Sequence, residues 1–276
     1  MKTRRWMFMV PLLVAVPGFA APMDHQMMMD KKTTPENGRD PHGYSDGYTL
    51  DSGPYALPGP RQLRLADEKR FFHLLVNKLE WQHSQAENVT AYDTQAWFGN
   101  TYDKLAVKAE GEWHKGKLAD ARTELLWQHA VSAYWNTQLG ARLDGGPGPA
   151  RKWLAFGIQG LSPYWFEVDA TAYVGEQGRT AFRLDSDYEL LITQRLILQP
   201  ALSLNWYGKD DVARGIGSGI ANTAVGLRLR YEFSRRFAPY IGVQRQHSWG
   251  RSADLARQDG EPVAQTQWLA GVRVWF

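Results

Sequence analysis

Sulfur and imidazole side chains are concentrated near the start of the chain. All seven methionines lie within the first 29 residues, and four of them fall within seven positions. Thioether sulfur is a soft ligand that suits Cu(I), and imidazole suits Cu(I) or Cu(II). Because the chain has no cysteine, Met and His are the soft ligands available to it. The cluster predicts a site for a copper ion, Cu(I) or Cu(II), formed by Met23, His25, Met27, Met28 and Met29. The alternative is a hydrophobic remnant beside a cleavage site.

A second group of candidate ligands is acidic. Two successive segments alternate apolar with polar residues, which places their carboxylates on one face of a sheet. Like charges on opposed residues of paired strands destabilise the pairing, so their negative charge must be compensated. If the sheet closes around a lumen, the compensation can come from protons, from a bound cation, or from Arg228, Arg230, Arg273 and Lys78 on the far side. On the same face, the flanking segments carry neutral polar residues and no cation. These residues are Gln159 on one side and Gln199, Ser203 and Asn205 on the other. Two hypotheses remain open, a structural ion-pair network and a cation-binding wall. The wall consists of Glu167, Asp169, Asp185, Asp187 and Glu189.

The elements that must position these carboxylates are strands. About twelve alternating segments of some ten residues each begin near residues 71, 90, 104, 119, 133, 152, 165, 180, 196, 223, 238 and 266. An even number returns both chain ends to the periplasmic side, where the connections should be short (100–103, 131–133, 162–163, 193–195 and 234–238). The longest connections, 144–152, 209–222 and 249–265, then lie outside. The pattern predicts an all-β fold, a transmembrane antiparallel β-barrel of about 12 strands with a disordered N-terminal tail.

The N-terminal residues predict export. Residues 1–20 combine Lys2, Arg4 and Arg5 with an apolar stretch too short to span a membrane and small residues at its end, as in a signal peptide. Residues 21–65 are rich in Pro and Gly without apolar periodicity, which predicts a disordered periplasmic tail that contains the Met/His cluster. Residues 66–276 are assigned to the barrel, and its terminal Phe276 is typical of a protein inserted into the outer membrane of a Gram-negative cell.

Other functions are disfavoured by the same residues. A net charge of +3, with acidic and basic residues interspersed, argues against a nucleic-acid partner. His83-Ser84 and His247-Ser248 are adjacent on strands, so their side chains point to opposite faces and cannot readily act as a hydrolase pair. His73 and His129 fall on the same face of their strands as the neighbouring apolar residues, which is the lipid-facing side, and are expected at the membrane interface.

Several stretches resemble the copper resistance protein B family (CopB/PcoB type) over roughly residues 70–276. The stretches are GLSPYWFEVDA (160–170), GRT (178–180), LLITQRLILQP (190–200), GLRLRYE (226–232), FAPYIGV (237–243) and AGVRVWF (270–276). The resemblance implies a non-enzymatic outer-membrane protein of copper homeostasis. Its expected partners are outer-membrane lipid and periplasmic copper-handling proteins such as a multicopper oxidase. Family tails often carry longer Met/His repeats, and this chain has one short cluster.

The resulting hypothesis is a barrel that binds copper ions and mediates their sequestration or passage across the outer membrane. The alternative is a general small-solute porin with an incidental Met-rich tail.

Overall fold

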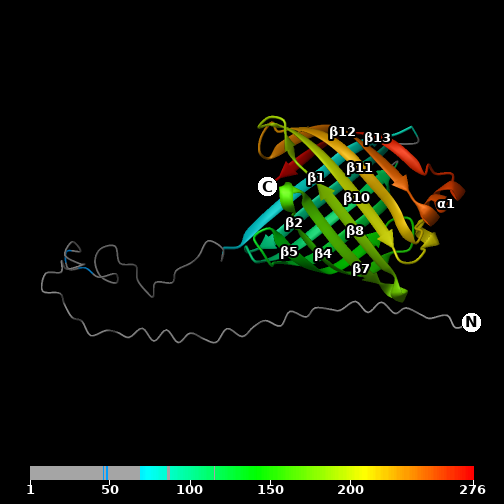
Figure 1. The fold of residues 1–276 in the computed structure, drawn as a ribbon, viewed down its shortest axis with the longest axis horizontal. Helices are drawn as coiled ribbons and strands as arrows, with labels where there is room; N and C mark the ends of the chain where they lie inside the picture. Colours follow the sequence, from blue (N-terminus) through cyan, green and yellow to red (C-terminus); the bar gives the residue numbers. More distant parts are fainter. Residues whose placement is uncertain (1–45, 47, 49–68, 86–87, 115) are drawn as a thin grey trace, which may run out of the picture. The chain divides into compact units, whose positions relative to one another are not determined.

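The computed structural model describes residues 46, 48, 69–85, 88–114 and 116–276. The chain divides at Gln62, and the account below concerns the second unit, Leu63–Phe276. The predicted signal peptide, most of the predicted tail and the whole Met/His cluster lie outside the described residues. Figure 1 shows the described part as a wall of tilted strands.

The wall is a closed antiparallel β-barrel. Strands pair with their neighbours in chain order, except that β8 and β9 both pair with β10, and the pairing of the first strand with the last closes the ring (Figure 1). Closure leaves no unpaired edge, as a spanning sheet requires in lipid. The strands are β1 (Phe71–His83), β2 (Asn88–Gly99), β3 (Asp103–His114), β4 (Lys117–Ala130), β5 (Trp135–Gly145), β6 (Arg151–Leu161), β7 (Glu167–Gly175), β8 (Thr180–Asp187), β9 (Leu190–Leu191), β10 (Leu196–Tyr207), β11 (Gly219–Tyr231), β12 (Phe237–Ser248) and β13 (Ala264–Trp275).

The predicted twelve-stranded barrel is confirmed. β8 and the two-residue β9 pair in succession with the same strand, β10, so together they form one of twelve wall strands. The sequence pattern predicted one segment beginning near residue 180 and no other before residue 196, whereas the structure interrupts that segment at Tyr188 and Glu189. Each wall strand begins within four residues of its predicted start. Alternation locates such strands well because it covers their whole length.

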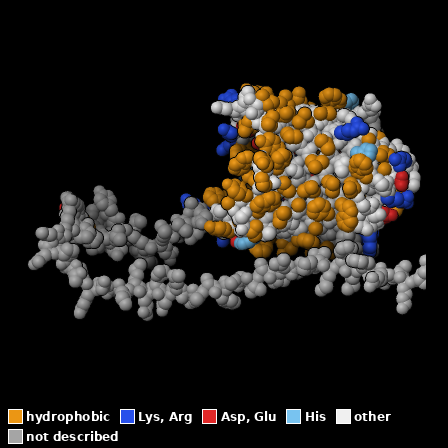
Figure 2. Space-filling view, in the orientation of Figure 1, with side chains coloured by type: hydrophobic (Ala, Val, Ile, Leu, Met, Phe, Trp, Pro, Cys, Tyr) orange, Lys and Arg blue, Asp and Glu red, His pale blue; other side chains and the backbone are white. Residues whose placement is uncertain are grey.

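The alternation of side chains separates a lipid face from a lumen. On β11, Leu227 is 42% exposed on the outside of the wall, whereas the next residue, Arg228, is 5% exposed inside it. The most exposed apolar side chains of the strands include Leu154, Ile241 and Trp268. Figure 2 shows hydrophobic side chains covering the wall, with charged side chains mostly toward its two ends. This is the outward apolar band of a membrane barrel.

The two ends of the barrel differ in their connections. At the end where β1 begins and β13 finishes, the connections are short, among them 100–102, 131–134 and the turn that contains η2 (Pro163–Trp165). The other end carries the long connections 208–218 and 249–263, the second of which contains α1 (Gly250–Gln258). The first end is therefore assigned to the periplasm. The predicted long loop 144–152 is in fact the short connection 146–150, because β5 and β6 extend further than expected. No described helix has the length and apolar character needed to cross a membrane.

Candidate functional site in the lumen

The lumen contains two connected spaces at its middle and its periplasmic end. A central cavity has a volume of about 230 Å³, and a wider space at the periplasmic end, called the vestibule here, has a volume of about 850 Å³. Both are lined by the four strand carboxylates of the predicted wall, which therefore lie where the two spaces meet. The vestibule lining includes Trp97, Lys104, Gln128, Gln159, Glu167 and Asp187.

The register of β7 and β8 places like charges opposite one another. Glu167 is the cross-strand partner of Asp187, and Asp169 is the partner of Asp185. The predicted opposition of the two carboxylate sets is therefore confirmed. Such pairs destabilise a ladder unless other charges compensate them, so the partners of each carboxylate decide what the group can do.

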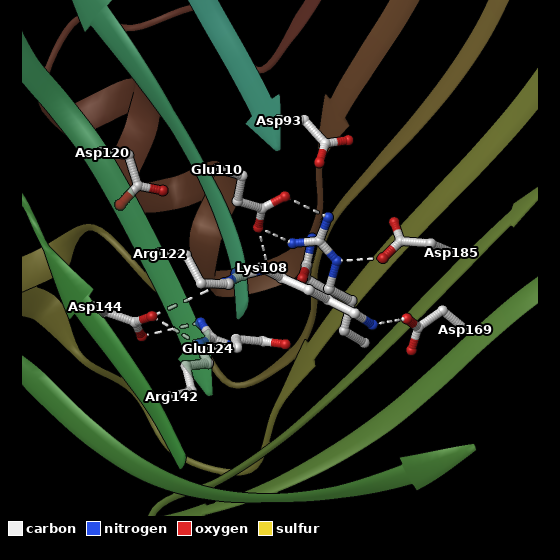
Figure 3. A network of polar contacts seen from close by, with 12 residues as sticks. Asp93, Lys108, Glu110, Asp120, Arg122, Glu124, Arg142, Asp144, Asp169 and Asp185 are labelled. Atoms are coloured by element: carbon white, nitrogen blue, oxygen red, sulfur yellow. Dashed lines mark hydrogen bonds and ion pairs between the residues drawn. The ribbon is translucent and has the colours of Figure 1, made fainter. Parts of the chain in front are cut away.

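Two of the carboxylates are neutralised in the middle of the lumen. Lys108 of β3 forms an ion pair with Asp169, which also accepts a hydrogen bond from Gln138. Arg183 of β8 forms an ion pair with Asp185 on its own strand. The same guanidinium binds Glu110, with 2.9 Å between Arg183 Nη2 and Glu110 Oε2. Figure 3 shows Lys108, Glu110, Asp169 and Asp185 converging on this network.

The sequence-based expectation for the compensating cations was partly wrong. Lys108 and Arg183 were not among the expected cations, although the alternation of their strands places both side chains on the lumenal face. Arg230 and Arg273 do reach the group, because each donates to Glu189, at 2.7 and 2.8 Å. The other two expected cations are used elsewhere, because Arg228 pairs with Glu80 and Lys78 pairs with Asp93.

Glu167 and Asp187 are the least neutralised members of the group. Asp187 accepts a hydrogen bond of 2.7 Å from the neutral Gln199 amide. Within the described ranges, no cationic side chain lies within 4.0 Å of the Glu167 carboxylate. Among the same residues, no three His, Asp or Glu side chains are arranged to hold a metal ion. The carboxylates therefore offer an excess of negative charge in the vestibule and no chelating geometry.

The outer half of the lumen has the opposite character. Arg142 donates to both oxygens of Asp144, at 2.6 and 2.9 Å, and Trp153 Nε1 donates to the same carboxylate at 2.8 Å. The Arg142 guanidinium carbon also lies 4.5 Å from the centroid of the Tyr173 ring, and the Tyr173 hydroxyl donates to Glu124 at 2.7 Å. All five side chains are buried. These contacts fill this half with paired charges and aromatic rings.

One lumenal residue was missed because of a β-bulge. Pairing between β1 and β2 shifts register between Val76 and Lys78, and a bulge reverses the alternation beyond it. His73 was expected to face lipid, but it pairs with Trp97, a vestibule residue, and its ring lies 5.6 Å from the Trp97 ring. The expectation for His73 is therefore wrong, whereas His129 keeps the lipid parity and contacts Trp127. The adjacent polar pair Asn77-Lys78, both in contact with Asp93, was the available signal of a bulge.

Comparison with known proteins identifies the family. The family model described as "Copper resistance protein B precursor (CopB)" matches residues 70–276. The chain belongs to the copper resistance protein B family. It is 47% identical over 204 residues to a copper resistance protein B homolog of Pseudomonas syringae pv. tomato, a match that covers 74% of this chain and 69% of that one. It is 44% identical to copper resistance protein B of Escherichia coli, with the same shares covered. The resemblance found in the sequence is confirmed.

Solved structures similar to this member of the copper resistance protein B family include porins. They include the NanC porin, with a TM-score of 0.49, 12% identity and coverage of 73% of this chain and 98% of that one. The KdgM porin gives a TM-score of 0.45, 12% identity and the same coverage. With its closed ring of membrane-facing strands and its family, the chain is an outer-membrane barrel of copper resistance.

Proposed function

We propose that this barrel binds copper ions in its N-terminal segment and mediates their sequestration or passage through a lumen that favours cations at its periplasmic end. The observation that carries the proposal is the charge of the vestibule. Four carboxylates and the ammonium group of Lys104 line it. Lys108 and Arg183 neutralise Asp169 and Asp185, whereas Glu167 and Asp187 have no ion pair among the described residues. A charged opening raises the local concentration of ions of the opposite sign.

Selectivity for copper is assigned to the N-terminal cluster. Carboxylates are hard ligands and discriminate poorly in favour of copper, whereas thioethers are soft ligands that suit Cu(I). The proposed copper ligands are Met23, His25, Met27, Met28 and Met29. In this division, the cluster selects the metal, and Glu167, Asp169, Asp185, Asp187 and Glu189 supply charge preference. Weak oxygen ligands also permit release, which passage requires.

The experiment is a Cu(I) titration of the full-length protein in detergent against a competing chelator under reducing conditions. The variant replaces the four clustered methionines with Leu, and the matched control replaces Leu50 and Leu57, which are apolar residues of the same predicted tail, with Ile. We expect the methionine variant to lose most of its Cu(I) binding and the control to retain it. Unchanged affinity in the methionine variant would rule out the thioether site.

The rival function, a general small-solute porin, predicts a different phenotype. A strain that lacks this gene and carries the methionine variant should then tolerate copper as well as one carrying the unaltered gene. On the copper proposal, the variant strain tolerates less copper, and its cell-associated copper changes. Cell-associated copper measured beside growth distinguishes the two functions.

A further inference from the structure

We propose that the connection 208–218, called the strap here, is a gate that closes the outer mouth of the barrel and must be released for ions to pass. The proposal concerns the passage itself and is independent of the metal. It rests on three features of the described residues, namely where the strap is anchored, what fills the space beneath it and how its backbone is shaped.

The strap is anchored on the far side of the mouth. It connects β10 to β11, yet Arg214 donates to Asp120 of β4 at 3.0 Å and to the carbonyl oxygens of Gly145 and Pro149, each at 3.1 Å. Around the ring of twelve, β4 and β5 lie four to six places from β10 and β11. The Arg214 side chain therefore crosses the opening.

A second anchor holds the middle of the strap. Asp211 accepts two hydrogen bonds from Arg151 of β6, from Nε at 2.7 Å and from Nη2 at 2.9 Å, and Arg179 Nε lies 3.6 Å from the same carboxylate. Bidentate pairing of guanidinium with carboxylate is among the strongest polar contacts. On the other flank, the Gly217 amide donates to Ser252 of α1 at 2.8 Å. The strap is thus fixed to three separate parts of the rim.

The space beneath the strap is nearly filled. The cavity bounded by Asp144, Trp153, Tyr207, Asp211 and Arg214 has a volume of about 10 Å³, which is at the lower limit for one water molecule. Ile216 of the strap packs against the buried cluster that contains Trp153 and Tyr207. This part of the outer mouth therefore leaves little room for a hydrated ion while the strap keeps this position.

The backbone of the strap is built to fold back sharply. η4 (Val212–Arg214) ends at Gly215, which has φ of +66° and no atom within 4 Å of where a Cβ would lie. Glycine is needed for this conformation and not for space. Asp211 and Ile216 close the loop through two backbone hydrogen bonds of 2.7 and 3.1 Å. The strap is a compact folded unit held by polar contacts to the rim and by the packing of Ile216, so it can move as one body when those contacts break.

The test uses single-channel recording of the full-length protein in planar bilayers with potassium chloride and no copper. Since the chain has no cysteine, Arg151→Cys with Asp211→Cys supplies the only thiols. The double variant removes the central anchor, and we expect its mean current to exceed the unaltered protein's at least tenfold. A short bifunctional methanethiosulfonate reagent then joins the two thiols and should return the current to the unaltered level, and reduction should raise it again.

Controls separate gating from misfolding and from chemical modification. The current of the single variant Arg151→Cys should not fall when the same reagent is added, because it has one thiol and cannot be cross-linked. Arg214→Ala should increase the current, whereas Arg257→Ala, which removes an exposed arginine of α1 at the same end, should not. Folding of each variant is checked by its thermal transition. Folded released variants that conduct no more than the unaltered protein, or a cross-link without effect on the current, would overturn the gate. Either result leaves the copper titration untouched.

Discussion

The outer and periplasmic halves of the lumen are built from the same alternating strands but resolve their charges differently. In the outer half, Arg142, Asp144 and Glu124 are buried and joined to specific partners. In the periplasmic half, Glu167 and Asp187 face each other across a ladder, and no cation of the described part of the chain forms an ion pair with either. Burial accounts for the difference, because an unpaired charge is very costly in a packed interior and much less so beside water. The packed half is suited to stability and closure, and the hollow half to attracting ions.

Removal of Arg142 should have the largest effect. Its guanidinium is 2% exposed and holds Asp144 by two hydrogen bonds. Arg142→Met removes both of these hydrogen bonds and leaves the buried carboxylate with only the Trp153 indole N–H at 2.8 Å and Arg122 at 3.8 Å, so the free energy of unfolding should fall by about 3–4 kcal/mol. Urea unfolding in detergent micelles, followed by tryptophan fluorescence, measures the loss. Arg257→Met, at an exposed ion pair, should change it by less than about 0.5 kcal/mol. Similar losses in both variants would contradict a packed outer half.

The assignment of faces underlies the comparison, and a charge on the lipid face tests it. Leu227→Arg near mid-membrane should cost about 2–4 kcal/mol and impair assembly. The lumenal substitution Ser203→Asn, on the neighbouring strand β10, should assemble normally. The fraction of folded protein in isolated outer membranes provides the measurement. Normal assembly of Leu227→Arg would mean that the parity of β11 is wrong.

The hydroxyl of Tyr173 provides a finer test of the outer half. It donates to Glu124, and both groups are buried. Tyr173→Phe leaves this carboxylate without that donor, so unfolding free energy should fall by about 1–3 kcal/mol. Tyr164→Phe serves as the control, because Tyr164 lies in the η2 turn with 83% of its surface exposed. A loss that is no greater than the control's would show that water replaces the donor.

Neutralising Glu167 should cost little or nothing. Its cross-strand neighbour is Asp187, so Glu167→Gln removes a repulsion. Unfolding free energy should change by less than about 0.5 kcal/mol or rise slightly. Glu189→Gln should be more damaging, because Glu189 accepts from Arg230 and Arg273. Urea unfolding of both variants in the same detergent compares the two losses of unfolding free energy. A larger loss in Glu167→Gln than in Glu189→Gln would mean that Glu167 is the carboxylate neutralised by cations.

The smallest effect expected is a dependence on pH of how firmly the strap closes the outer mouth. Hydrogen bonds and charge from Arg151, with charge from Arg179 and Arg214, lower the pKa of Asp211, although partial burial opposes them. A carboxyl with a lowered pKa contributes stability above its ordinary pKa, and this contribution is lost as the pH falls through the lowered value. The Asp211 anchor of the strap should therefore loosen in acid, below about pH 4. Bilayer currents recorded from pH 7 to pH 3 test this, and Asp211→Asn should remove the acid-dependent step.

Much of the fold was predictable because alternation repeats along every strand. Leu227 and Arg228 take opposite faces as their parity requires. The alternation failed to place His73, because one extra residue in β1 reverses the pattern and only the adjacent polar pair Asn77-Lys78 marks that residue in the sequence.

The candidate site was less predictable. Parity placed Asp169 and Asp185 in the lumen, but their partners come from distant positions. Lys108 lies 61 residues from Asp169, and Arg183 binds both Asp185 and Glu110. Such pairings depend on side-chain reach across a closed ring. The strap was visible only as a long connection, because the contacts of Arg214 require the mouth to exist first.

The measurement closest to the central claim probes the sign of charge in the vestibule. Gln159→Cys places a single thiol in its lining. Cationic and anionic methanethiosulfonate reagents of similar size are applied to the purified barrel, and their rates are compared with those for a neutral small thiol in solution. We expect the ratio of cationic to anionic rates to exceed the solution ratio by about tenfold or more. Glu167→Gln with Asp169→Asn and Asp187→Asn should bring it back toward the solution value. If Gln159→Cys with all five carboxylates of the wall intact gives the same ratio as the small thiol in solution, the periplasmic half does not attract cations.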